Sequence, residues 1–398
     1  PAVGNKVPSV ASLTNSKIQR RLINGISKTL NSGKNSLIAL NNDALLVEGN
    51  PGTALTFVNS GWKSVVPCSV SNGEQWFAGG SGALTSKSFL YIINSGFSDS
   101  SVELQIYTPN GLIEPKSVVI PQNSTKKISI DTLVPGEDSI VIGVKTLSGR
   151  VSSYLLDERK KGLKSLGADF VSPVATANKK VTIAGISGLT GKQISNVNSV
   201  AHTLRLLIPG TIDANIDVTI NSNDGNFIPE GLAQFNIKNQ RVLDIPLTFA
   251  PVNQPFSLII DSDQPILASV LSEFTFGKSK EIAWATGADE LSRWSINLSG
   301  SKPVLSFSGN KINVQISATA INGKKIDKKI TGTDFLVWNA PSGLNRLQIT
   351  ANSDGIFGGV IFFPEVGSIG SSYIPMNNGA NLETASEPIS DASVISRG

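Results

Sequence analysis

Two stretches of the sequence share one pattern of apolar and polar residues, and this pattern indicates the fold class. Residues 90–111 read LYIINSGFSDSSVELQIYTPNG, and residues 204–225 read LRLLIPGTIDANIDVTINSNDG. Each stretch begins with an apolar run, passes through a polar turn into a segment that alternates apolar and polar residues, and ends in a tight turn with glycine. Alternation with a period of two is typical of a half-buried β-strand, and Asn-Gly and Asp-Gly favour hairpin turns. We therefore expect the same two-stranded unit in both places.

A second shared motif follows each unit. It consists of an apolar strand, a polar turn and another apolar strand with small residues at its centre, and it occurs at 139–158, 256–274 and 347–365. A shorter match lies at 36–49. Similarity at a spacing of roughly 80 to 110 residues indicates tandem repeats. We predict about three and a half repeats, the incomplete one N-terminal, with its absent strands upstream of residue 1.

The turn signals predict the architecture of each repeat. They recur about every 8 to 12 residues, which is the spacing of antiparallel sandwiches. The fold class is therefore all-β, with tandem antiparallel β-sandwich (Ig-like) modules; only residues 17–30 could form a helix. The predicted divisions are an incomplete N-terminal β module at 1–78, β-sandwich repeats at 79–180, 181–292 and 293–376, and an extended or disordered tail at 377–398.

The connections between modules are short. The linkers are expected at 172–180 and 287–294, and Gly-Ala-Asp occurs near both of them, at 167–169 and at 287–289. Linkers of this length predict that neighbouring modules touch, so we expect a bent or linear array. The Asp261 and Asp263 pair is expected in a turn, where Asp commonly bonds its own backbone.

Composition indicates an extracytoplasmic protein that is secreted or anchored at the cell envelope. Charged residues make up 16% of the chain, against about 25% in an average soluble protein. The net charge is +4, and the lysines form no basic stripe interleaved with aromatic residues, which argues against a nucleic-acid partner. Cys68 is the single cysteine, so it forms no intrachain disulfide and is interpreted as a small buried hydrophobe. No apolar run reaches about 18 residues, so membrane contact would need a segment missing from this chain.

The sequence contains no recognisable catalytic or metal-binding group. His202 is the single histidine, and no cluster of ligands at metal spacing surrounds it. The carboxylate pairs Asp157–Glu158, Asp261 with Asp263, and Asp289–Glu290 could serve a glycosidase. Asp157–Glu158 and Glu273 lie at equivalent repeat ends, which favours a structural role. Asp261 and Asp263 lack the further oxygen ligands that calcium needs. We expect no enzyme activity, no cofactor and no metal.

Tryptophan supplies the weak candidates for ligand binding, namely Trp62, Trp76 and Trp338. Exposed indole rings can stack on sugars, whereas buried ones pack cores and module junctions. Trp76, Trp284 and Trp294 lie near predicted boundaries, and this position favours junction packing.

Several motifs resemble an actinobacterial family of unknown function. They are Pro67-Cys68, the run EQWFAGG at 74–80, LYIIN at 90–94, and GADFV at 167–171. Ser95 stands where the family has Pro, and Phe170 where it has Trp. The resemblance covers about residues 45–365. It implies an exported or membrane-anchored β-sandwich repeat protein that often accompanies envelope glycosyltransferases, and it brings no catalytic residue with it.

Four functions remain open at this point. The first is a non-catalytic scaffold that presents rigid modules to an envelope protein, with a membrane glycosyltransferase as one candidate, or to cell-wall polysaccharide. The second is a carbohydrate-binding accessory, which needs at least two exposed Trp or Tyr rings on one concave face. The third is a hydrolase with a carboxylate pair in a cleft. The fourth is a surface-layer or shell protein, which would self-associate along module edges.

Overall fold

The all-β fold class is confirmed. A computed structural model describes residues 9–12, 18–22, 28–30, 36–38, 44–48, 54–59, 62–188, 197–251, 253–363 and 370–377. These residues form antiparallel sheets and one short 3-10 helix, Ile130–Thr132. Within these ranges, no helix is long and apolar enough to cross a membrane. The predicted tail beyond residue 377 lies outside the described residues.

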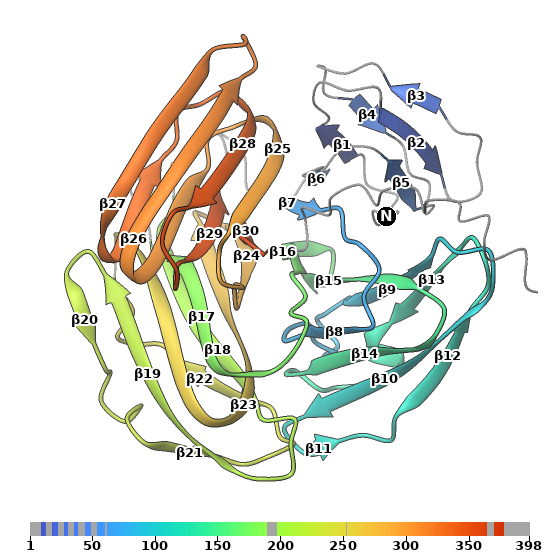
Figure 1. Ribbon diagram of the computed structural model, residues 1–398. Helices are drawn as coiled ribbons and strands as arrows, with labels where there is room; N and C mark the ends of the chain where they lie inside the picture. The colour runs from blue at the N-terminus through green and yellow to red at the C-terminus, as the bar shows by residue number, and fades with distance from the viewer. Residues whose placement is uncertain are drawn as a thin grey trace, which may run out of the picture.

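The first sandwich, residues 74–171, consists of two facing sheets (Figure 1). One sheet has the order β11-β10-β14-β8, with β12 also on β10, and the other has the order β13-β9-β15-β16. Along β10, Val102, Leu104 and Ile106 alternate with more exposed residues and are buried in the core between the sheets. The strands are β8 (Glu74–Phe77), β9 (Phe89–Asn94), β10 (Ser100–Thr108), β11 (Gly111–Leu112), β12 (Lys116–Ile120), β13 (Ser124–Ser129), β14 (Val141–Ser148), β15 (Val151–Lys161) and β16 (Lys164–Val171).

The second sandwich, residues 178–286, repeats this pairing. The order β8-β14-β10 corresponds to β17-β23-β19, and β13-β9-β15-β16 corresponds to β22-β18-β23-β24. The strands are β17 (Asn178–Ser187), β18 (Ser199–Leu207), β19 (Ala214–Ser222), β20 (Gly225–Phe227), β21 (Phe235–Ile237), β22 (Leu243–Pro246), β23 (Pro255–Phe276) and β24 (Ser279–Thr286).

The turn expected at Asp261 and Asp263 is wrong, because β23 continues through it for 22 residues. The first half of β23 pairs with β17 and β19, and the second half pairs with β18 and β24. One strand therefore serves both sheets. Asp261 and Asp263 at its centre are exposed, and Asp263 accepts hydrogen bonds from Asn215 instead of closing a turn.

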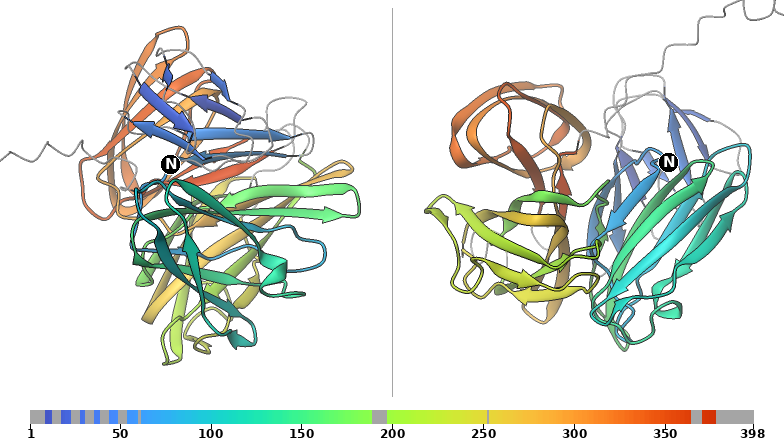
Figure 2. Two further views of the ribbon diagram at one scale, coloured as in Figure 1. Left: turned by 90° about the vertical axis from the view of Figure 1, so that its right-hand side faces the viewer. Right: turned by 60° about the horizontal axis from the view of Figure 1, so that its bottom comes forward.

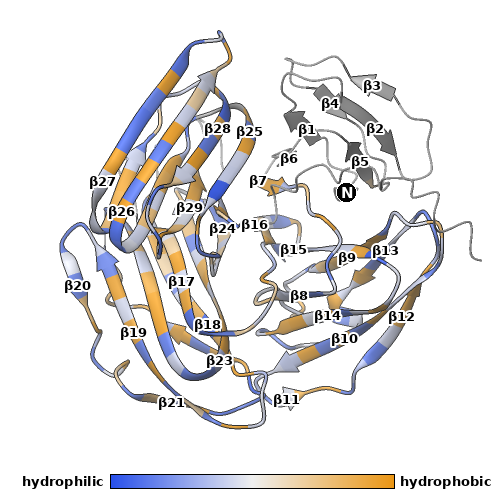
Figure 3. Ribbon diagram, in the orientation of Figure 1, coloured by the Kyte–Doolittle hydropathy of each residue, from blue (hydrophilic) through white to orange (hydrophobic). Residues whose placement is uncertain are grey.

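The C-terminal module, residues 293–375, uses the same device. β26 pairs with β29 through its first half and with β28 through its second half, and β27 accompanies it along both. Hydrophobic and hydrophilic residues alternate along β26 and β27, as Figure 3 shows. The strands are β25 (Arg293–Ser301), β26 (Val304–Ala320), β27 (Lys325–Asn339), β28 (Leu344–Ala351), β29 (Phe357–Phe362) and β30 (Ser372–Pro375).

The N-terminal module, residues 9–67, has the sheets β4-β1-β6-β7 and β3-β2-β5. Strands β2 and β3 lie in the one segment, residues 17–30, that could have formed a helix from its sequence. β8 pairs with β14 and belongs to the first sandwich, although the boundary predicted at 78 placed it before the division. The strands are β1 (Ser9–Ser12), β2 (Ile18–Leu22), β3 (Lys28–Leu30), β4 (Ser36–Ile38), β5 (Leu45–Glu48), β6 (Ala54–Asn59) and β7 (Trp62–Pro67).

The modules are arranged around a common centre (Figures 1 and 2). We call β7, β16, β24 and β30, the last strand of each module, the hub strands. β16 and β30 each lie next to both β7 and β24, so the contacts close a ring. Neighbouring modules share their cores: Trp284 of the second sandwich packs in the core of the first, Tyr373 in that of the second, and Val65 in that of the C-terminal module. Phe57 and Phe170, with ring centroids 5.0 Å apart, join the N-terminal module to the first sandwich.

The Gly-Ala-Asp at 167–169 is part of the hub, within β16, and not a linker. Gly167 has φ +110°, and a Cβ there would lie 2.5 Å from the backbone nitrogen of Ile282 on β24. Glycine is needed here because both the backbone conformation and the close approach of the neighbouring strand exclude a side chain. The second Gly-Ala-Asp, at 287–289, follows β24 outside the hub.

We expect Gly167→Ala to lower the free energy of unfolding by at least about 2 kcal/mol, since it combines a strained φ with a backbone clash. Chemical denaturation of both proteins measures the difference. Gly210→Ala is the matched control, because a Cβ at Gly210 meets no atom within 4 Å. Equal losses in the two variants would show that the approach of β16 to β24 is not tight.

Candidate functional site

One buried carboxylate joins all four hub strands. Asp169 on β16 accepts hydrogen bonds from Ser64 Oγ on β7 (2.5 Å), Ser372 Oγ on β30 (2.9 Å) and the Trp284 backbone nitrogen on β24 (2.9 Å). The side chain is fully buried, and burial raises its pKa to about 7. A protonated carboxyl is the favoured form of a buried acid without a cationic partner, and its hydroxyl can bond a serine oxygen.

Asp157 on β15 lies opposite Asp169 on β16, but its pKa is lowered, which favours the ionised carboxylate. Burial by itself would raise its pKa, but Arg159, whose Nε lies 3.2 Å away, and hydrogen bonds from Ser88 and the Trp284 indole outweigh burial and lower it. The two carboxyl groups therefore differ because only Asp157 has a cation beside it.

Glu281 on β24 is a third buried acid in the hub. Its Oε1 accepts hydrogen bonds from the backbone nitrogens of Ala168 (2.9 Å) and Ile282 (3.0 Å). Burial raises its pKa well above the usual range, and the nearby Asp169 adds to this. Burial therefore favours the neutral forms of Asp169 and Glu281, which avoid the cost of burying unpaired charge.

Arg205 on β18 fastens the second sandwich to the first. It makes a bidentate ion pair with Asp244, at 2.8 Å for both bonds, and donates to the carbonyl oxygens of Gly80 (2.8 Å) and Ile140 (3.1 Å). Its guanidinium lies 5.0 Å from the Trp284 ring. Planar bidentate geometry and stacking are properties of arginine that lysine does not share.

These acids do not form a hydrolytic pair. Asp157 and Asp169 are both 0% exposed, so a substrate cannot contact them. Asp289 and Glu290 are exposed neighbours on a loop. Among the described residues, no group of three or more His, Cys, Asp or Glu side chains is placed to hold a metal ion.

The three tryptophans considered for ligand binding, Trp62, Trp76 and Trp338, lie in different parts of the structure. Trp62 is 2% exposed at the start of β7, and Trp76 is 6% exposed at the junction of the two sandwiches, packed with Leu207 and Leu267. Trp338 is half-buried on β27 and packs against the core of the C-terminal module. The remaining tryptophans and all four tyrosines are buried: Trp284, Trp294, Tyr91, Tyr107, Tyr154 and Tyr373.

His202 and Cys68 have structural surroundings. His202 is buried on β18, where its Nδ1 lies 2.9 Å from Ser272 Oγ and its ring meets the edge of Phe256. Burial lowers its pKa to about 4, so it is neutral at physiological pH. Cys68 is half-buried and follows β7, and burial raises the pKa of its thiol.

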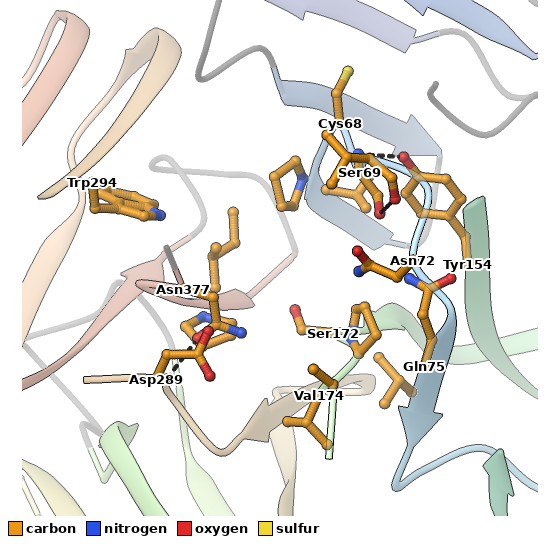
Figure 4. A pocket seen from close by; sticks show the side chains of 18 residues that line it. Cys68, Ser69, Asn72, Gln75, Tyr154, Ser172, Val174, Asp289, Trp294 and Asn377 are labelled. Carbon is orange, nitrogen blue, oxygen red and sulfur yellow. Dashed lines mark hydrogen bonds between the residues drawn. The ribbon is translucent and has the colours of Figure 1, made fainter. Parts of the chain in front are cut away.

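A pocket of about 240 Å³ opens at one end of the hub, where three hub strands end (Figure 4). Pro67, Pro173 and Pro375 line it, each at or just after the end of a hub strand, and Trp294 closes one side. Proline has no backbone N–H, so it suits the end of a paired strand. This pocket could not be predicted from the sequence, because its walls come from five separate segments: 66–75, 154, 171–175, 289–294 and 374–377.

Gln75 on β8 also lines this pocket and is 1% exposed. Its Oε1 accepts a hydrogen bond from the backbone nitrogen of Ser153 at 2.9 Å. Its Nε2 is buried and has no hydrogen-bond partner. In Figure 4 the Gln75 amide nitrogen faces the side of Asn72.

The family and structural comparisons are as follows. The model of a family described as "Family of unknown function (DUF5719)" matches residues 63–331, which is more than half of the chain. No curated protein matches the chain. Among solved structures, the α-L-rhamnosidase of Streptomyces avermitilis complexed with L-rhamnose is 8% identical, with a TM-score of 0.15. The comparison covers 89% of this chain but 54% of that one, and a similarity this low carries no argument about fold or function.

The raised pKa of Asp169 predicts that the free energy of unfolding falls as the pH rises. Between about pH 4, the ordinary pKa of Asp, and about pH 7, the folded chain keeps a proton that the unfolded chain releases. The contribution to the free energy of unfolding is complete below pH 4 and is lost as the pH approaches 7, a difference of about 4 kcal/mol. Urea unfolding between pH 4 and pH 8 measures it.

Asp169→Asn should make this decline shallower, because the amide accepts from Trp284 and donates to a serine oxygen at every pH. Asp354→Asn, in an exposed turn, is the matched control and should keep the slope of the wild type. The same slope in Asp169→Asn and the wild type would contradict the assignment of a protonated carboxyl at the hub.

Proposed function

Since the chain belongs to the Family of unknown function (DUF5719), we propose that it is a non-catalytic interaction scaffold of the bacterial cell envelope. It holds its β modules in one fixed arrangement and presents their outer surfaces to a partner. The observation that carries this proposal is the set of hydrogen bonds from Ser64, Trp284 and Ser372 to Asp169, because they bring one strand of every module to a single buried side chain.

Rigidity is the property that the contacts support best. The modules share hydrophobic cores around the ring, and Arg205 of the second sandwich donates hydrogen bonds to the carbonyl oxygens of Gly80 and Ile140 in the first. A protein that only linked two points would not need such extensive contacts between neighbouring modules. A scaffold that sets the position of a partner does need them, because its interaction free energy depends on a geometry fixed in advance.

The envelope location and the partner rest on sequence arguments. The low charged fraction and the single cysteine are typical of an exported bacterial β-protein. The motif resemblance supports an actinobacterial origin and a membrane glycosyltransferase or cell-wall polysaccharide as the partner. Sugar binding on surface tryptophans finds little support, because Trp62 and Trp76 are buried in packed interiors.

Sedimentation of the purified chain with washed actinobacterial envelope membranes tests the proposal. We expect saturable binding by the wild type and by Asp169→Asn, and binding at least about tenfold weaker for Asp169→Ala, which removes the acceptor for Trp284, Ser64 and Ser372. Circular dichroism and the thermal midpoint of each variant show whether its modules remain folded.

Two results would contradict the scaffold proposal. One is an absence of saturable binding by the wild type to membranes and to isolated cell-wall polysaccharide. The other is equal binding by the wild type and by a folded Asp169→Ala whose modules have separated in small-angle X-ray scattering, since a fixed arrangement would then be unnecessary.

A further inference from the structure

The pocket at the end of the hub is lined by a buried hydrogen-bond donor without a partner, the side-chain nitrogen of Gln75. Ser153 donates its backbone N–H to Gln75 Oε1, and this bond decides which end of the amide is oxygen. The Nε2 group must then face the other way, toward the pocket side (Figure 4). An unpaired buried donor costs about 1–3 kcal/mol, so an acceptor atom bound in the pocket would recover stability.

The lining excludes an anionic ligand. None of the residues around the pocket is Lys, Arg or His, and Asp289 contributes a negative charge at the rim. The polar groups are amides and hydroxyls, including those of Asn72, Ser172 and Asn377. Asn377 Oδ1 accepts a hydrogen bond from the Asp289 backbone nitrogen at 2.9 Å, which orients its amide nitrogen as a donor. Such a set of donors and acceptors matches a neutral ligand with several hydroxyl groups.

The rest of the wall is apolar and rigid. Pro67, Pro173 and Pro375 line the pocket, and Trp294, which is 2% exposed, forms part of its wall. A neutral sugar ring has one face of C–H groups that packs against such a surface, while its edge carries hydroxyls. A volume of about 240 Å³ suits one such ring and is smaller than the usual pocket for a drug-sized ligand.

We propose that this pocket binds one neutral sugar ring, with Gln75 Nε2 donating to a hydroxyl or ring oxygen of the sugar. The inference deepens the scaffold function by naming the class of partner, and it rests on that function only because the locked hub forms the pocket. The sugar can be free or can be the end of a glycan chain, and both present the same chemistry to Gln75.

Isothermal titration of the purified chain tests the pocket without any envelope fraction. The probes are the methyl glycosides of glucose, galactose, mannose and arabinose, and short neutral oligosaccharides that end in the same sugars. At least one methyl glycoside should bind saturably. A higher affinity for the oligosaccharide identifies a chain end as the ligand, and an equal affinity identifies a single ring.

Two variants locate the site. Gln75→Met removes the donor at nearly constant volume and should weaken binding about tenfold, whereas Gln105→Met, outside the pocket, should leave it unchanged. Ser172→Phe narrows the pocket and leaves the bond between Gln75 and Ser153 in place, so it replaces Gln75→Met if that variant does not fold. Glucuronic acid and glucose 6-phosphate should not bind, because no cation lines the pocket.

Three results would overturn the inference. They are no binding of any neutral glycoside, binding that both pocket variants leave unchanged, and binding of a blocked triproline peptide in place of the sugars. In each case membrane sedimentation still tests the scaffold separately, since that assay does not depend on glycoside binding. Conversely, glycoside binding by a chain that binds neither membranes nor isolated cell-wall polysaccharide would support the pocket and contradict the scaffold.

Discussion

The structure depends on the hydrogen bonds that converge on Asp169. This one side chain accepts from a hydroxyl on β7, a hydroxyl on β30 and a backbone N–H on β24, while it belongs to β16 itself. A charged carboxylate in this position would be costly, since it is fully buried and Arg159 pairs with Asp157 instead. The raised pKa resolves this conflict, because a neutral carboxyl needs no counter-ion and can both donate and accept hydrogen bonds.

Shared hydrophobic cores join the modules outside this central contact. Trp284 packs into the first sandwich, Tyr373 into the second sandwich and Val65 into the C-terminal module, so each of these three cores includes a residue of a neighbouring module. This arrangement resembles repeat proteins, in which the interface between units contributes a large part of the stability. It also explains the position of the pocket: hub strands from three modules end together, and their prolines leave a small, rigid opening there.

Strand periodicity made much of the fold predictable. The alternation along β10, β19 and β26 and the turns at Asn-Gly and Asp-Gly are local signals, and they agree with the structure. The prediction of a turn at Asp261 was wrong, because exposed polar residues at the centre of a long strand have the same sequence pattern as a turn. The role of Asp169 was not predictable, since its partners lie 105, 115 and 203 residues away. The role of Gln75 was also not predictable from the sequence. Its Nε2 is identified as an unpaired donor only because the structure shows that its Oε1 accepts a hydrogen bond from the Ser153 backbone nitrogen.

The hub and the shared cores should make the modules one cooperative unit. Differential scanning calorimetry of the wild type at pH 5, where the protonated form of Asp169 is favoured, measures this cooperativity. We expect a single endotherm whose calorimetric and van't Hoff enthalpies agree. Two or more separate transitions, each with the enthalpy expected for about 100 residues, would show that the modules unfold independently and would contradict it.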